Sequence, residues 1–393
     1  MKTMKWKFYS LAFVAGMSIL TACSSDDNND NDGNGGNGNG NEIENGTILK
    51  GTITSDVTLA AGNTYKLSGE YIVEEGGTLH IEEGVKIIAV YDDIADYILV
   101  KQGGKINAVG TPDKPIVMTS EKEEPGAWGG IHICGRAHTN AEGGKGSSEI
   151  GGTVYGGNDD ADNSGTLQYI RLEYTGFAFD EEHEANGISF YSVGNGTIVD
   201  HCQAYKGSDD GFEFFGGSVN VSNLVAVSCS DDSFDWTEGW NGKGTNLVAY
   251  QEAESTLGYD CDCLMECDNN GSNNAATPVA HPVLKNLILV GNGGSKQGIR
   301  LRAGTEVEID NAKVCGKGQP LTVETALTEN ALKNGTSKLT NITLTSELSS
   351  KEGIYTHADF IAVTSNKVDA NLSYSSFEDI RKECSWMNGS WVK

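Results

Sequence analysis

A short pattern repeats along the middle of the chain at intervals of about 22 to 25 residues. Each copy places a polar residue between two apolar ones, as in Phe212-Glu213-Phe214. The copies lie at residues 186–190, 210–214, 232–236 and 298–302. In a strand such alternation turns the apolar side chains toward an interior and the polar one outward. Because one unit this short cannot bury its own core, the repetition predicts a stack of coils.

A second set of short strands repeats in phase with the first, and each copy opens on an asparagine: Asn223, Asn246, Asn286 and Asn341. Together the two sets predict an all-β fold, a right-handed parallel β-helix with coils of about 22–25 residues and capped ends. An antiparallel sandwich would need hairpin turns and would not keep two strand sets in phase. We expect the asparagine amides to turn inward at the bends and to link successive coils by hydrogen bonds.

Both ends of the stack need a cover, because an open coil exposes unpaired strand edges. Residues 46–75 are expected to begin the helix and to cap its first coil. The stretch 321–334 has the pattern of a short helix or an insertion. Residues 375–393, which include Trp386 and Trp391, are expected to close the other end.

The amino terminus has the pattern of a lipoprotein signal peptide, residues 1–22. Three lysines precede an apolar run of 13 residues, which is too short to span a membrane, and the run ends in Leu-Thr-Ala before Cys23. Cys23 is the expected site of lipidation. Residues 23–45 are rich in Asp, Asn and Gly and predict a flexible tether. We therefore expect a single domain, residues 46–393, held at the outer membrane by lipid on Cys23 and exposed at the cell surface.

Charge and cysteine content limit the possible partners further. Asp and Glu number 55 against 28 Lys and Arg, a formal net charge of −27, which argues against nucleic acid as a partner. Eight cysteines follow Cys23, and an even number in an exported chain permits disulfides. The close set Cys261, Cys263 and Cys267 has no common zinc spacing, so a local disulfide or free buried thiols are favoured over a metal site.

The repeat predicts that acidic side chains gather on the outer surface. If the strands at 212–214 and 234–236 stack, Glu213 and Asp235 lie side by side, about 5 Å apart. Four more acids lie in the bends before these strands. The complete set of candidate metal ligands is Asp209, Asp210, Glu213, Asp231, Asp232 and Asp235.

Three explanations for this acidic set remain open. It can be a solvated face without a ligand, or a calcium site built from carboxylate oxygens. It can also be catalytic, because a carboxylate pair about 5 Å apart suits a retaining glycosidase. A lyase would instead pair calcium with an arginine base, and Arg300 falls in the same outward column about two coils beyond Asp235. That separation, about 10 Å, weakens the lyase interpretation.

Other polar and aromatic groups are weaker candidates. The loop at 180–184 reads as a polar excursion between coils, and Asp159, Asp160 and Asp162 lie in a bend that suits either calcium or backbone hydrogen bonds. A surface for stacking against sugars could be formed by exposed aromatic residues, although Phe and Trp in coils are usually core; the residues considered are Tyr155, Phe177, Phe179 and Trp240.

Four segments of the chain resemble a family of exported right-handed β-helix proteins, frequent among Bacteroidetes-type bacteria and often lipid-anchored. These segments are residues 111–120, 126–135, 155–174 and 208–217. The resemblance covers about residues 70 to 310 and implies a pectate-lyase-like architecture and a secreted or cell-surface location. It implies no particular reaction. The acidic residues just after Cys23 also resemble the signal that sends lipoproteins of such bacteria to the outer leaflet.

These observations favour a surface-anchored binding or adhesion module that presents an acidic face to glycans or to a partner protein, with calcium as a possible structural cofactor. The alternative is a polysaccharide lyase or glycoside hydrolase that acts on acidic polysaccharide. Such an enzyme needs loops that rise beside the acidic set. The segments 176–185 and 251–277 are the expected material for such walls. A purely structural surface spacer is the third hypothesis.

Overall fold

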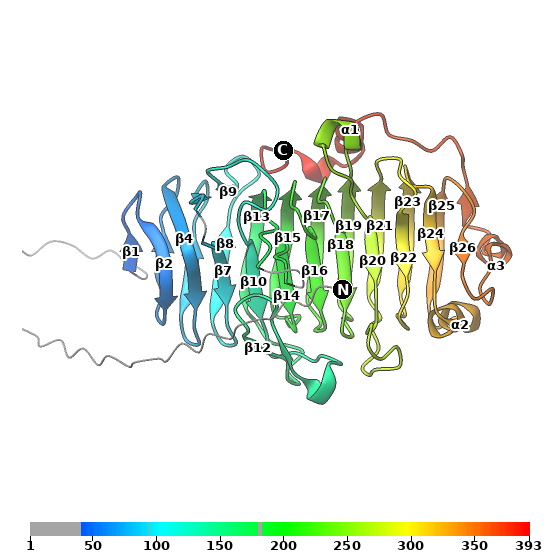
Figure 1. The fold of residues 1–393 in the computed structure, drawn as a ribbon, viewed down its shortest axis with the longest axis horizontal. Coiled ribbons are helices and arrows are strands. Elements are labelled where there is room, and N and C mark those ends of the chain that lie inside the picture. Colours follow the sequence, from blue (N-terminus) through cyan, green and yellow to red (C-terminus); the bar gives the residue numbers. More distant parts are fainter. Residues whose placement is uncertain (1–40, 93, 180–182) are drawn as a thin grey trace, which may run out of the picture. The chain divides into compact units, whose positions relative to one another are not determined.

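The computed structural model describes residues 41–92, 94–179 and 183–393. Its strands pair almost entirely in parallel, each with the equivalent strand of the next coil (Figure 1). The predicted all-β parallel β-helix is therefore confirmed. Each coil has three sides, which we call A, B and C in the order in which the chain passes through them.

The strands are as follows. Side A of the first coils holds β1 (Asn41–Ile43), β3 (Val57–Leu59), β5 (Thr78–Ile81) and β8 (Lys105–Val109). Side B holds β6 (Lys86–Ala89), β9 (Ile116–Ser120) and β27 (Lys367–Val368). In the later coils one long strand runs through both side A and side B. These strands are β13 (Gly165–Glu173), β15 (Ile198–Tyr205), β17 (Asn220–Val227), β19 (Lys243–Tyr250), β21 (Val283–Val290), β23 (Glu308–Cys315) and β25 (Lys338–Leu344).

Side C holds β7 (Tyr97–Val100), β10 (Ile131–Cys134), β14 (Ile188–Tyr191), β16 (Phe212–Phe215), β18 (Phe234–Thr237), β20 (Met265–Cys267), β22 (Gln297–Leu301), β24 (Gln319–Val323) and β26 (Ser349–Ser350). Near the start of the stack, β2 (Ile48–Ile53) and β4 (Thr64–Val73) each run through sides B and C. The first strand, β1, pairs with β3, so paired structure begins within the segment 23–45 that the sequence suggested as a tether.

Like residues stack above one another in the interior, because the strands pair in register. Phe190 lies over Phe214 with ring centroids 5.0 Å apart, and Phe214 in turn lies 4.2 Å from Trp240. All three rings are buried in the main core. This continuous interior column of rings fixes the direction of the polar residue between them, which must point away from the core.

A residue in the left-handed backbone region separates sides A and B in each long strand. It is Asn223, Asn246, Asn286, Asn311 and Asn341 in five coils, with φ between 56° and 63°. Asparagine tolerates this conformation better than most residues. The prediction that these amides turn inward is wrong, because Asn286, Asn311 and Asn341 are exposed and the positive φ directs the side chain outward. The amides do link coils: Asn246 Nδ2 donates to Asn223 Oδ1 at 2.8 Å, and Asn286 Nδ2 donates to Asn246 Oδ1 at 3.0 Å.

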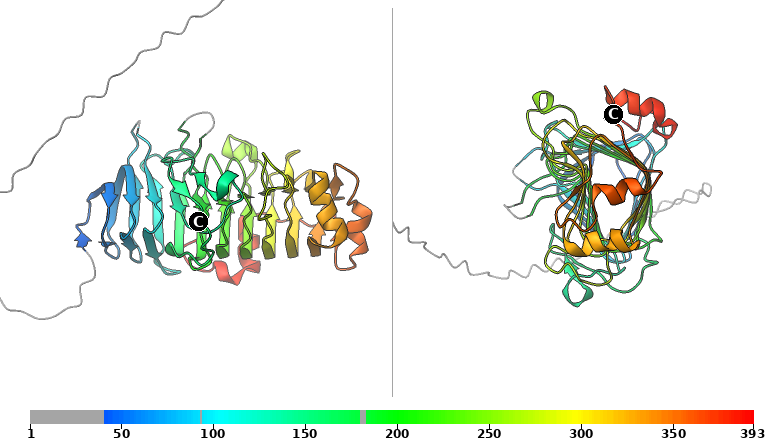
Figure 2. Two further views of the ribbon diagram at one scale, coloured as in Figure 1. Left: turned by 90° about the horizontal axis from the view of Figure 1, so that it is seen from below. Right: turned by 90° about the vertical axis from the view of Figure 1, so that its right-hand side faces the viewer.

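Two helices close the carboxyl-terminal end of the stack, as Figure 2 shows on its right. These are α2 (Ala326–Asn334), within the stretch where a short helix was predicted, and α3 (His357–Ala362). Leu332 of α2 and Phe360 of α3 extend the main core. Glu329 Oε2 accepts backbone N–H groups from Ile354 and Tyr355, which ties α2 to the loop before α3.

Residues 375–393 do not close that end, so this prediction is wrong. After α3 the chain runs back along the outside of the coils, and the segment appears in red in Figure 1. It contains α4 (Phe377–Glu383) and η2 (Ser385–Met387). Trp391 and Met387 pack with Val225, Val248 and Ile288, which point outward from side B. Burial of this apolar stripe gives the segment a stable position on the side of the stack.

None of the helices in the described residues is long and apolar enough to cross a membrane. The remaining short helices lie in loops: η1 (Glu142–Gly144) follows β10, and α1 (Glu254–Leu257) follows β19. The antiparallel pair β11 (Gly146–Ser147) and β12 (Val154–Tyr155) belongs to the same excursion as η1. These loops matter because they leave the stack at the edges of side C.

The asparagine bend leads to a test of stability. Asn246→Ala removes two inter-coil hydrogen bonds, each of which contributes about 1 kcal/mol to the unfolding free energy. It also puts alanine in the left-handed backbone region, which costs about 1 kcal/mol more. Asn246→Gly removes the same hydrogen bonds without the backbone cost. We expect urea denaturation to show the alanine variant less stable than the glycine variant by about 1 kcal/mol. Equal stabilities would contradict this account of the bend.

Candidate functional site

The acidic set predicted from the repeat lies on side C, with its carboxylates outside the coil. Glu213 of β16 pairs in register with Asp235 of β18, as predicted. Asp235 pairs with Glu266 of β20, and Glu266 pairs with Arg300 of β22. Arg300 therefore lies two coils beyond Asp235, which is also the predicted position. We call the outward row Glu213, Asp235, Glu266 and Arg300 the acidic column.

The bends before these strands bring further carboxylates to the same place. Asp210 Oδ1 accepts the backbone N–H of Asp232 at 2.8 Å, and Asp232 Oδ1 accepts that of Cys263 at 2.6 Å. Each of these aspartates thus links its bend to the next coil with one oxygen. The second oxygen of each remains for another partner.

The six predicted metal ligands and Glu266 form three overlapping groups. In each group, one carboxylate oxygen per residue lies within 4.8 Å of the others. The groups are Asp209 with Asp210 and Asp231, Asp210 with Glu213 and Asp235, and Asp232 with Asp235 and Glu266. Shared members make this one continuous cluster rather than separate acid pairs. A fourth group joins Asp232 to Asp262 and Cys263.

Positive charge balances only one end of this cluster. Arg300 Nη1 lies 2.8 Å from Glu266 Oε2, and Arg302 lies 2.5 Å from Glu266 Oε1 and 2.7 Å from Asp268. Within residues 41–92, 94–179 and 183–393, no Lys or Arg forms a close ion pair with the six predicted ligands, although the charges of Lys296 and Arg302 act on Asp231 and Asp235. These six ligands are Asp209, Asp210, Glu213, Asp231, Asp232 and Asp235.

Hydrogen bonding is also incomplete there. Asn186 Nδ2 donates to Glu213 Oε2 at 2.6 Å. The Oδ1 atoms of Asp235 and of Asn186 are buried and have no hydrogen-bond partner among the described residues. An unpartnered buried oxygen is costly, and here two lie beside carboxylates that already repel one another. This combination favours a bound cation or bound protons at the cluster.

The pKa values show the same repulsion. Burial, with Coulomb repulsion from Asp231, raises the pKa of Asp209 to about 7. Burial and neighbouring carboxylates hold the pKa values of Glu213 and Asp235 well above the ordinary range. By contrast, hydrogen bonds from His201 and other neighbours lower the pKa of Asp200, on another side of the coil, to about 2. The acids of this cluster therefore differ from Asp200 in the direction of their pKa shift.

A further carboxylate reaches the column from a loop that the sequence did not indicate. Glu149 lies in the excursion between β10 and β13, and Tyr191 Oη donates to its Oε2 at 3.2 Å. Burial raises the pKa of Glu149 to about 7, and Glu149 in turn raises that of Glu213. Glu149 lies 64 residues before Glu213 and outside the repeat, so only the fold brings the two together.

Loops border the column on both edges. On the side where the strands end, the excursion 135–164 meets the loop after β20, where Asn140 Nδ2 donates to Asn269 Oδ1 at 2.8 Å. On the side where they begin, residues 251–264 carry α1 and lead into β20. The segment 251–277 thus supplies both edges, while 135–164 is a border that was not predicted. Part of the expected wall at 176–185, residues 180–182, lies outside the described residues.

The remaining candidates have structural roles. Trp240 and Tyr155 are buried, so the core alternative holds for them and they offer no sugar-stacking surface, whereas Phe179 is 37% exposed. Asp160 contacts His138 Nδ1 at 2.6 Å, and Asp162 accepts a hydrogen bond from Ser164. The cysteines of the described residues are all free and buried, in agreement with the thiol alternative.

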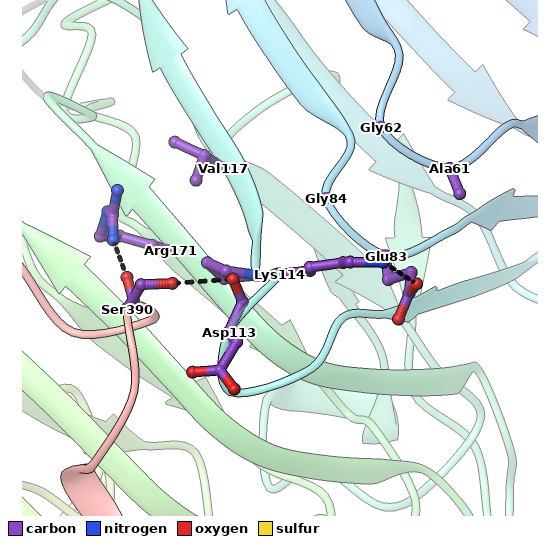
Figure 3. A pocket seen from close by; sticks show the side chains of 10 residues that line it. Ala61, Gly62, Glu83, Gly84, Asp113, Lys114, Val117, Arg171 and Ser390 are labelled. Carbon is purple, nitrogen blue, oxygen red and sulfur yellow. Dashed lines mark hydrogen bonds and ion pairs between the residues drawn. The ribbon is translucent and has the colours of Figure 1, made fainter.

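Another pocket lies beside side B, with a volume of about 530 Å³ (Figure 3). Lys114 and Arg171 line it, but Lys114 Nζ pairs with Glu83 at 2.8 Å, and Arg171 Nη1 donates to the carbonyl oxygen of Ser390 at 2.7 Å. Because both cations are already paired, this pocket is a weaker candidate for an anion site than the acidic column is for a cation site.

Comparison with known proteins gives one family and one structural similarity. A family model described as a pectate-lyase like beta helix domain matches residues 51–392. No curated protein sequence matches the chain. Among solved structures, the Dettilon tailspike protein is similar with 8% sequence identity and a TM-score of 0.29. That alignment covers 76% of this chain and 56% of the tailspike chain.

The raised pKa of Asp209 predicts a specific dependence of stability on pH. Its stabilising contribution is fully present below the unfolded value, about 4, and is lost as pH rises through the folded value of about 7. In the presence of a chelator, Asp209→Asn, which stays neutral, is therefore expected to equal the wild type near pH 4. It should be more stable than the wild type by about 4 kcal/mol at pH 8, since each pKa unit corresponds to about 1.4 kcal/mol.

Thermal and urea unfolding at a series of pH values measures this difference. Glu347→Gln at an exposed position is the matched control and should show no such trend. A benefit of Asp209→Asn that is the same at pH 4 and pH 8 would contradict the raised pKa.

Proposed function

The chain belongs to the family of pectate-lyase like β-helix domains, and we propose that its acidic column binds a divalent cation and, through it, an acidic polysaccharide. The observation that carries this proposal is the buried Asp235 Oδ1, which has no hydrogen-bond partner among the described residues and lies within a cluster of carboxylates. No Lys or Arg of the described residues forms a close ion pair with Asp235, although the charge of Arg302 acts on it. In the three groups that contain the predicted ligands and Glu266 the donors are all oxygens, which suits calcium better than a softer metal.

The cation has two roles in this proposal. It replaces the protons that Asp209, Glu213 and Asp235 would otherwise hold at neutral pH, and so relieves the repulsion within the cluster. It also allows an anionic glycan to approach a chain of net charge −27, because its free coordination positions can accept carboxylate oxygens of the glycan. The bordering loops 135–164 and 251–277 would contact the glycan on either side.

The anchoring predicted from the sequence belongs to the same proposal. Lipid on Cys23 would hold the protein at the outer membrane, and the segment between Cys23 and β1 would let the coils face the medium. A module that binds glycan at the cell surface then retains polysaccharide near the cell. Adhesion to a partner protein through the same acidic face is the remaining form of this hypothesis.

The lyase alternative is weakened by the position of Arg300. Its guanidinium contacts Glu266 at 2.8 Å and Glu324 at 3.3 Å, and these carboxylates raise its pKa further. A guanidinium held between two carboxylates keeps its proton and cannot act as a base at ordinary pH.

A glycoside hydrolase remains a second candidate, because one specific observation favours it. Glu213 and Asp235 are direct neighbours on adjacent parallel strands, about 4.8 Å apart, close to the carboxylate separation of retaining enzymes, about 5–5.5 Å. Both pKa values are raised, so that one residue could hold the proton of a general acid.

Calcium binding tests the main proposal. Isothermal titration of the full chain with calcium is expected to show binding that Asp235→Asn and Glu213→Gln abolish or weaken at least about tenfold, and that Glu347→Gln leaves unchanged. Calcium at about 100 times its Kd should raise the unfolding free energy by about 2.7 kcal/mol. Retention on immobilised polygalacturonate should then require calcium and be lost in chelator. Absence of calcium binding by the wild type would refute the proposal.

Cleavage assays decide the second candidate. If the column hydrolyses glycosidic bonds, incubation with polygalacturonate or alginate releases reducing ends, and Glu213→Gln lowers the rate at least about 100-fold. Glu347→Gln should not change it. Cleavage that persists in Glu213→Gln would exclude this pair as the catalytic carboxylates, and an ultraviolet-absorbing unsaturated product would identify a lyase instead.

A further inference from the structure

A second groove lies on side B, between the coils and the carboxyl-terminal segment. Its volume is about 260 Å³, slightly below the usual range for ligand pockets of about 300–1,000 Å³, so it suits only a small group. The amides of Asn246, Asn286 and Asn311 line it from the coils, and Trp386 lines it from η2. This groove is on a different side of the coil from the acidic column and shares no residue with it.

The three amides form a ladder with hydrogen bonds that all run in one direction. Asn286 donates to Asn246 at 3.0 Å, and Asn311 donates to Asn286 at 2.8 Å. The ladder stops there, because Asn341 donates to Asp310 instead. A primary amide has two N–H donors and two acceptor lone pairs. Each rung within the ladder therefore keeps a donor and an acceptor that can face the groove.

The backbone does not require asparagine at these positions. In earlier coils the same left-handed bend is occupied by Tyr169 and His201, with φ of 53° and 52°. Their rings stack on one another at 4.4 Å, and the ring of Trp391 packs against both. Rings thus occupy the bend where Trp391 covers it, whereas amides occupy the bends that line the groove and also the bends at Asn223 and Asn341 beyond it.

The groove is lined without a net charge. Lys313 forms an ion pair with Glu383, and Tyr374 Oη also donates to Glu383 at 2.8 Å. Val248 and Ile288 supply an apolar floor, and Trp386 is half-buried beside it. The groove therefore offers neutral donors and acceptors, an aromatic side and an apolar surface.

We propose that this groove binds a neutral saccharide unit without a cation. Sugar hydroxyl groups donate and accept at once, as the free positions of the amide rungs do, and the C–H face of a sugar ring packs on an indole or an aliphatic surface. An anionic sugar has no unpaired cation here within the described residues and faces the repulsion of a chain of net charge −27. The site thus differs from the acidic column in both ligand charge and cation requirement.

Saturation-transfer NMR with the full chain tests the proposal in the presence of a chelator. The probes are the methyl glycosides of glucose, galactose, mannose and xylose. We expect at least one to bind the wild type, and binding to be unchanged in Asp235→Asn, which disables the acidic column alone. Asn311→Gly and Trp386→Ala should each weaken binding at least about tenfold.

Asn341→Gly is the matched control, because it removes an amide at an equivalent bend outside the groove and should change affinity less than about twofold. Circular dichroism and thermal unfolding of Asn311→Gly and Trp386→Ala check that loss of binding does not reflect misfolding. The proposal is overturned if no glycoside binds the wild type, or if binding survives in both Asn311→Gly and Trp386→Ala.

Discussion

The in-register hydrogen bonding of parallel strands is the constraint on which the rest of this structure depends. It places each residue of a coil directly beside its equivalent in the next coil, about 4.8 Å away. Inside the coils this stacks rings such as Phe190 and Phe214 into one core. Outside, the same register forces side chains of like charge into rows. The acidic column is a consequence of the pairing that stabilises the fold.

The polar and charged side chains of the outward rows are paired in different ways. At the bend between sides A and B, amides satisfy one another along the row, and this arrangement is neutral. Further along side C, Arg300 and Arg302 alternate with carboxylates and balance them. Among the described residues, the acids from Asp209 to Asp235 form no close ion pair with a Lys or Arg, although the charges of Lys296 and Arg302 act on Asp231 and Asp235. Such a local excess of charge inside bordering loops is typical of a functional site rather than of a stabilising feature.

Sequence reasoning succeeded where the repeat determines position and failed where it does not. The register of Glu213 with Asp235, and of Arg300 two coils further on, follows from counting residues in the pattern. Glu149 was missed, because it belongs to an excursion whose path depends on tertiary contacts. The place of Trp391 was also missed, although a signal was present. Val225 and Val248 alternate with interior residues and needed a cover on side B, which the carboxyl-terminal segment provides.

That segment also changes how the stack resists unravelling. In a solenoid, each coil contacts mainly its neighbours, so a stack can lose coils one at a time from an end. Here Lys393 contacts Glu173 at 3.2 Å and Ser390 donates its backbone N–H to Pro112, while Glu383 pairs with Lys313. One strap therefore joins early coils to late ones. When force is applied to either end, the carboxyl-terminal segment links the coils that it contacts, so these coils are expected to unfold together rather than one at a time.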